Sequence, residues 1–184
     1  MRLIQAYTAL GAAEAPAETL ETARKIAVWM QRRGYTLRTS GEPGIPRAFE
    51  AGVTWPSALE VILPESPYHG RTASPVGPAY IADTASFQAA QKLLASIENS
   101  STTSTDDAAI AMVLQILGRD LESPSDFVVL WKQPDDRDTS GRTRTLRAIA
   151  HTANIPVWNL AIPSEAAQLR KLLRDIDLEN QQIL

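Results

Sequence analysis

Tyr35-Thr36-Leu37-Arg38-Thr39-Ser40-Gly41-Glu42-Pro43-Gly44 is the segment around which we build the predicted fold. Residues 35–39 look like a buried strand, which ends in a tight glycine and proline turn at residues 40–44. The chain then passes directly into a short helix over residues 45–52. In an open α/β sheet, backbone N–H groups gather at such a junction and bind small anionic ligands. The sequence therefore predicts a candidate ligand site at this turn.

A second strand–turn–helix unit lies downstream. Residues 126–131 are its predicted strand, Ser140 and Gly141 its turn, and residues 142–153 its helix. The run Phe127–Trp131 is continuously apolar, which indicates a strand that is covered on both faces. If the turns of the two units face each other, they enclose one crevice.

The first half of the chain alternates strands and helices, which predicts parallel pairing with right-handed crossovers and an α/β fold. Pro16 and Gly34 stand at the two ends of the clearest helix, where proline and glycine are preferred. The predicted strands lie at residues 2–8, 35–39, 59–63, 126–131 and 156–160, with turns after residues 8 and 39. The predicted helices lie at residues 16–33, 45–52, 88–97, 106–117 and 142–153 and from Ser164 onward.

Length and composition predict a single domain spanning residues 1–184. With 44% hydrophobic and 21% charged residues, the chain resembles an average globular protein that buries its own core. Within it we expect a long loop at 64–84, a polar linker at 99–105, and a tail at 177–184 that extends the last helix or frays.

Composition also excludes several classes of function. The chain has no cysteine and two distant histidines, so neither a metal site nor a disulfide framework is expected. A net charge of −3 offers no general case for nucleic-acid or membrane binding. The N-terminus lacks a signal-peptide core, and no apolar run is long enough for a bilayer. We therefore expect a cytoplasmic protein without membrane contact, metal or cofactor.

Several blocks of the sequence resemble, in order and spacing, the motifs of one family. These blocks are Tyr7–Pro16, Arg38–Gly44, Ala48–Gly52, Glu60–Pro64, Leu117–Leu121, Pro124–Val129 and Ile155–Leu160. Together they resemble the short, often phage-encoded, DNA-processing-protein-A-like members of the SLOG superfamily. The resemblance covers nearly the whole chain. It implies a Rossmann-like three-layer αβα sandwich with a mainly parallel central sheet, and relatives that commonly self-associate as homo-oligomers.

The sequence departs from that family at both turns. The family's glycine-rich second turn is replaced by Ser140-Gly141-Arg142-Thr143, and the first turn keeps only part of the glycine set. Fewer glycines leave less room for the backbone to approach a phosphate. The departures therefore indicate a nucleotide pocket that has been reshaped or lost.

The candidate ligand site combines the two turns with the glycine that follows the first strand. The predicted ligand-binding residues are Gly11, Ser40, Gly41, Gly44, Glu50, Ser140, Gly141, Arg142 and Thr143. Glycine and serine are also ordinary turn residues, so the first-turn set fits a purely structural role equally well.

Three arginines, Arg142, Arg144 and Arg147, cluster near a predicted helix start, which normally prefers acidic side chains. A bound phosphate among them would supply the missing negative charge. Neutralisation by the aspartates within residues 135–138 explains the cluster equally well. Glu50 is expected either to face the crevice, as a ribose ligand or an acid/base, or to be solvated on an exposed helix.

Three classes of function follow from these residues and from the resemblance. Local basic turns on an acidic protein fit a small anionic ligand better than a long polyanion. We therefore predict a protein that binds a nucleotide or a nucleotide-derived small molecule, as a signal sensor or a sequestering protein. The alternatives are a single-stranded DNA-binding, recombination-mediator-like protein and a nucleoside-monophosphate phosphoribohydrolase. Hydrolysis is disfavoured, because Thr145, Leu146 and Arg147 stand where the phosphoribohydrolases of the superfamily carry a catalytic glutamate.

Overall fold

The computed structural model describes residues 5–97, 106–134 and 141–181. Its six strands form one sheet in the order β4-β3-β2-β1-β5-β6, and every neighbouring pair is parallel. The strands are β1 (Ala6–Gly11), β2 (Thr36–Thr39), β3 (Leu59–Leu63), β4 (Ala79–Ile81), β5 (Phe127–Trp131) and β6 (Val157–Asn159). The helices are α1 (Ala17–Gln31), α2 (Ile45–Glu50), α3 (Thr84–Ile97), α4 (Asp107–Leu117), α5 (Arg142–Thr152) and α6 (Pro163–Gln181), with a short 3-10 turn at Pro56–Ala58.

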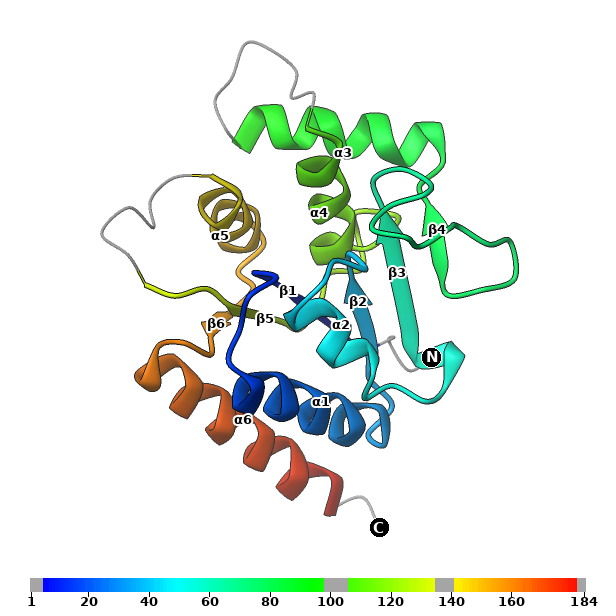
Figure 1. The fold of residues 1–184 in the computed structure, drawn as a ribbon. Helices are drawn as coiled ribbons and strands as arrows, with labels where there is room; N and C mark the ends of the chain where they lie inside the picture. Colours follow the sequence, from blue (N-terminus) through cyan, green and yellow to red (C-terminus); the bar gives the residue numbers. More distant parts are fainter. Residues whose placement is uncertain (1–4, 98–105, 135–140, 182–184) are drawn as a thin grey trace.

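Helices cover both faces of the sheet (Figure 1). One core packs α1, α2 and α6 against one face of the strands, and a second packs α3, α4 and α5 against the other. In β5, Phe127 and Val129 enter the first core while Val128 and Leu130 enter the second, because successive strand residues point to opposite faces. The prediction of a Rossmann-like three-layer αβα sandwich is confirmed, and its sheet is entirely parallel.

β1 ends three residues later than predicted, whereas the ends of the other predicted strands differ by at most one residue. β1 continues through Ala9, Leu10 and Gly11, which the sequence analysis assigned to a turn. These residues pair with β5, as far as Gly11 opposite Trp131. A partner strand distant in the sequence therefore extends β1 beyond the point where the local pattern ends it.

The predicted loop over residues 64–84 contains the edge strand β4 and the start of α3. β4 pairs with β3 but has only three residues, so no periodicity reveals it. α3 begins four residues earlier than predicted. Asp83 explains the earlier start, because its carboxylate accepts hydrogen bonds from the Ser86 backbone N–H and hydroxyl, both at 2.9 Å.

The other differences are smaller. α6 begins at Pro163, so Ser164 lies inside the helix instead of capping it, and the helix continues to Gln181.

The predicted linker at 99–105 and the turn residue Ser140 lie outside the described residues. Among the helices that the structure describes, none combines the length and apolar character needed to cross a membrane.

Candidate functional site

In this sheet order, the junction between β1 and β5 differs from the other strand junctions. From β1 the chain winds outward through β2, β3 and β4, and then crosses back to form β5 and β6 on the other side of β1. The carboxyl ends of β1 and β5 therefore lie side by side where the winding direction reverses. In open α/β sheets, ligands bind outside the strand ends at such a switch point.

A cavity of about 250 Å³ lies at this point. Its walls come from the ends of β1, β2 and β5, from α4, and from the first turns of α5. The lining residues are Leu10, Gly11, Ala12, Ser40, Glu42, Pro64, Tyr68, Ala108, Ala111, Met112, Gln115, Leu130, Lys132, Arg142, Thr143 and Leu146.

One wall of the cavity is a stripe along α4. Ala111 and Met112 lie three and four residues after Ala108 and four and three residues before Gln115, so the four residues share one face of the helix. The helix is buried from Ala109 to its end at residue 117. This wall is therefore part of the protein core, and it is apolar except at Gln115.

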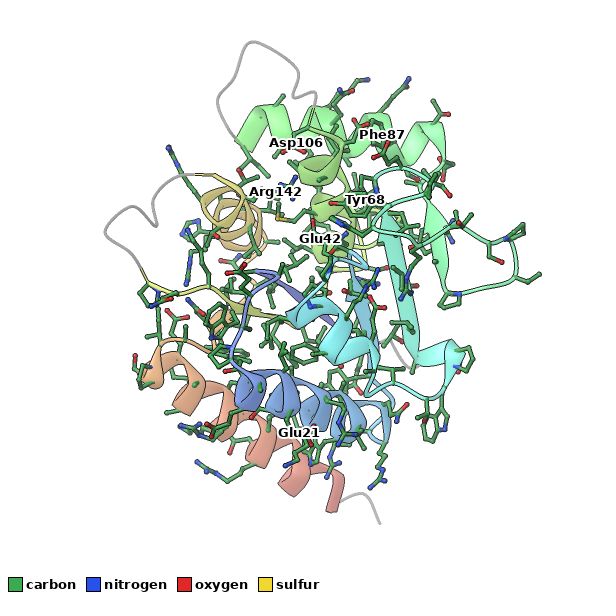
Figure 2. All side chains as sticks on the ribbon, viewed as in Figure 1. Glu21, Glu42, Tyr68, Phe87, Asp106 and Arg142 are labelled. Carbon is green, nitrogen blue, oxygen red and sulfur yellow. The ribbon has the colours of Figure 1, made fainter. Side chains whose placement is uncertain are left out.

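Charged and polar side chains gather at the mouth of the cavity. The Tyr68 hydroxyl donates to Glu42 Oε1 at 2.6 Å, and Arg142 Nη1 donates to the same oxygen at 3.1 Å. Arg142 Nε also lies 3.7 Å from an Asp106 carboxylate oxygen. Figure 2 labels these four residues, which come from the first turn, the loop after β3, the start of α4 and the start of α5. The two predicted turns therefore face each other through the Glu42–Arg142 contact.

The residues at the mouth shift one another's pKa values. Partial burial, together with the hydrogen bond and charge of Glu42, raises the pKa of Tyr68 to about 12. Burial lowers the pKa of Arg142, but Asp106, Glu42 and Tyr68 together raise it above its ordinary value. Arg142 is therefore cationic and the Tyr68 hydroxyl is protonated at neutral pH.

The predicted site residues fall into three groups. Those that line the cavity are Gly11, Ser40, Arg142 and Thr143; those that do not are Gly41, Gly44, Glu50 and Gly141; Ser140 is outside the described residues. Gly41 packs against β3 instead, where an added Cβ would lie 3.1 Å from Val61 Cγ1. The first turn thus contributes its Ser40 and Glu42 side chains to the cavity.

Gly44 supports the fold next to the cavity. It has a φ of +83°, and an added Cβ would lie 2.3 Å from the Ala12 carbonyl oxygen and 2.6 Å from that of Ala13. The loop after β1 therefore packs directly on the Gly44 backbone. The absence of a side chain at Gly44 therefore lets the backbone at Ala12 and Ala13 pack closely against it, whereas the sequence suggested room for a ligand.

The two expectations for Glu50, a crevice acid or a solvated side chain, are both wrong. Glu50 is buried, with 8% of its surface exposed, and it forms an ion pair with Arg71. Burial raises the pKa of Glu50, while Arg71, Arg47 and Thr39 oppose the shift. Glu50 therefore fastens the loop after β3 to α2.

Two of the three clustered arginines have acidic partners on other elements. Arg142 contacts Glu42 and Asp106, and an Arg147 guanidinium nitrogen lies 3.4 Å from a Glu165 carboxylate oxygen. The aspartates considered as alternative partners, within residues 135–138, lie outside the described residues.

Sequence reasoning missed several residues that line the cavity: Glu42, Tyr68, Met112, Gln115, Leu130 and Lys132. Gln115 carries a usable signal, because it is the one polar residue between positions 108 and 117. Glu42 and Tyr68 carry none, since their pairing joins positions 26 residues apart.

No protein-family model matches the sequence, and no curated protein matches it. Among solved structures, the fold is similar to that of DNA processing protein A from Helicobacter pylori, described for its single-stranded DNA binding mode. The two share 10% sequence identity at a TM-score of 0.58, over 98% of this chain and 82% of the other. At this identity the likeness concerns the fold alone. It supports a DNA-processing-protein-A-like fold and leaves the SLOG and phage-type assignments as predictions.

Proposed function

We propose that this protein binds a nucleotide or a nucleotide-derived small molecule in the cavity at the carboxyl ends of β1 and β5. The observation that carries the proposal is the combination of an apolar, largely core-built wall with a charged mouth at the switch point of a parallel sheet.

The wall suits the base of such a ligand. Leu10, Leu130 and Leu146 line the same cavity of about 250 Å³ as the apolar part of the α4 stripe. Small-molecule sites are typically lined by apolar side chains, with a few polar groups that set the orientation of the ligand. A planar, weakly hydrated ring fits this composition better than a phosphate does.

The mouth suits the sugar and phosphate. Arg142, Lys132 and Thr143 line the cavity at the start of α5 and the end of β5, and a helix start favours an anion. A phosphate bound to Arg142 would replace Glu42 as an anionic partner of that side chain. Glu42 would then accept hydrogen bonds from ribose hydroxyls, the role expected of Glu50 before its position was known.

A thermal-shift screen against nucleoside monophosphates, dinucleotide cofactors and cyclic nucleotides tests the proposal. A ligand at a hundred times its Kd stabilises the folded state by about 2.7 kcal/mol. For a chain of this size that raises the Tm by about 5–11 °C. The shift should fall sharply in Arg142→Ala and persist in Arg170→Ala, which removes an exposed arginine on α6, away from the cavity. If no nucleotide shifts the Tm, the proposal is wrong.

Binding of single-stranded DNA is the second candidate, because the structural neighbour is described by that property. A strand binder neutralises several phosphates, so its affinity falls steeply as the salt concentration rises. Fluorescence anisotropy with an oligonucleotide at increasing salt distinguishes the candidates. Tight, salt-sensitive oligonucleotide binding without any mononucleotide shift would favour the DNA function over the small-molecule one.

A further inference from the structure

Gln115 stands out among the residues of α4. It is 1% exposed, and its neighbours from Ala108 to Leu117 are all apolar. It is also the polar member of the α4 stripe that lines the cavity. A buried amide is unfavourable unless its polar atoms find partners.

The two ends of the Gln115 amide are satisfied unequally. Its Nε2 donates to the Ile62 carbonyl oxygen at 2.9 Å, and this bond fixes the orientation of the amide, since a flip would set two oxygens against each other. Its Oε1 is buried and accepts no hydrogen bond from any residue that the structure describes. Of the described buried side-chain atoms in that condition, Gln115 Oε1 is the one on a cavity-lining residue.

Gln115 also lies far from the charged mouth. Asp106, which contacts Arg142, precedes α4, and Gln115 is nine residues further along. At 1.5 Å per residue the two positions are about 13 Å apart along the helix axis. A nucleotide with its phosphate at the mouth would therefore reach Gln115 only by directing its base along α4.

We propose that Gln115 Oε1 accepts a hydrogen bond from an exocyclic amino group of the ligand's base, so that the protein selects amino-bearing nucleobases. The inference rests on the proposed function and names the ligand class for the same cavity. A site with a buried acceptor rejects an analogue that lacks the donor, because the acceptor then stays unpaired.

The test uses matched 5′-monophosphates that differ in one amino group, with isothermal titration of the purified chain. The pairs are adenosine and purine riboside, guanosine and inosine, and cytidine and its 4-deamino analogue. Wild type should bind the amino member of at least one pair about tenfold more tightly or better. Gln115→Met, which keeps the side-chain length but removes the acceptor, should reduce that ratio to near one.

Two further variants separate recognition from structure. Leu114→Met alters a buried α4 residue that does not line the cavity, and it should keep the wild-type ratio. Gln115→Glu retains an acceptor oxygen and should keep a preference for the amino member, even if the loss of the bond to Ile62 weakens both ligands.

The possible outcomes separate the two proposals. If wild type binds both members of every pair equally, or Gln115→Met keeps the preference, the Gln115 inference is wrong while the cavity's function stands. The wild-type comparison decides this even if Gln115→Met does not fold. If no member of any pair binds, the proposed function fails, and the Gln115 inference fails with it.

Discussion

The substitution Gly44→Ala tests the packing beneath the candidate site most directly. Gly44 has a φ of +83° and a ψ of −128°, a backbone conformation that side chains with a Cβ rarely adopt. Holding alanine there costs about 1–3 kcal/mol. The added Cβ would also lie 2.3 Å from the Ala12 carbonyl oxygen, and forcing atoms into a packed region costs about 1–3 kcal/mol more.

The expected loss for Gly44→Ala is therefore about 4 kcal/mol, the middle of the summed range. For a chain of 150–250 residues, each kcal/mol lowers the Tm by about 2–4 °C, so the Tm should fall by about 8–16 °C. Thermal unfolding followed by circular dichroism measures the change.

Gly34→Ala is the matched control. Gly34 has a similar φ of +82°, but no neighbouring atom lies within 4 Å of its added Cβ. This variant also places alanine at a positive φ, but without the steric contact, so its Tm should fall by clearly less. Equal losses in the two variants would show that the loop after β1 does not press on Gly44, and would refute the packing described for the first turn.

The remaining predictions concern a buried hydroxyl, a buried acid and the mouth of the cavity. Thr8→Val should lower the free energy of unfolding in urea by about 1–3 kcal/mol, because the hydroxyl donates to the Gln115 carbonyl at 2.6 Å; Thr8→Ser should lose less. Because burial raises the pKa of Glu50, the stability this carboxyl contributes is complete below its ordinary value and is lost as pH rises through the folded pKa. The free energy of unfolding of wild type minus that of Glu50→Gln should therefore fall as pH rises, and a rise in this signed difference would contradict the shift. Arg142→Ala should lower the free energy of unfolding by at most about 1 kcal/mol, because the side chain is 55% exposed. A larger loss would show that the contact between Arg142 and Glu42 is needed for the stability of the fold.

Local sequence patterns predicted most of the architecture. The bounds of β3 and the apolar core of β5 agree with the structure, because β5 is a continuous apolar run and β3, apolar except at Glu60, ends at Pro64. The same patterns failed for β1 and β4. β1 is lengthened by pairing with a strand more than a hundred residues away, and β4 is too short to show any periodicity.

The candidate site was less predictable than the fold. Glycine-rich turns pointed to the edge of the sheet where the cavity lies and where Gly11 and Ser40 line it. They did not reveal that Gly41 and Gly44 serve the packing of the protein's own chain. Glu42 was missed because its partners, Tyr68 and Arg142, follow it by 26 and 100 residues, and only the tertiary structure brings them together.

The burial of α4 has a consequence for how this cavity can change in evolution or engineering. Replacing a residue of its cavity-lining stripe disturbs both the shape of the cavity and the central hydrophobic packing, so most such changes lower stability. The polar rim, at Glu42, Tyr68 and Arg142, is partly solvated and tolerates exchange far more readily. If the cavity binds a ligand as proposed, new ligand preferences should therefore arise first by substitutions at the rim, while α4 limits the size of the ligand.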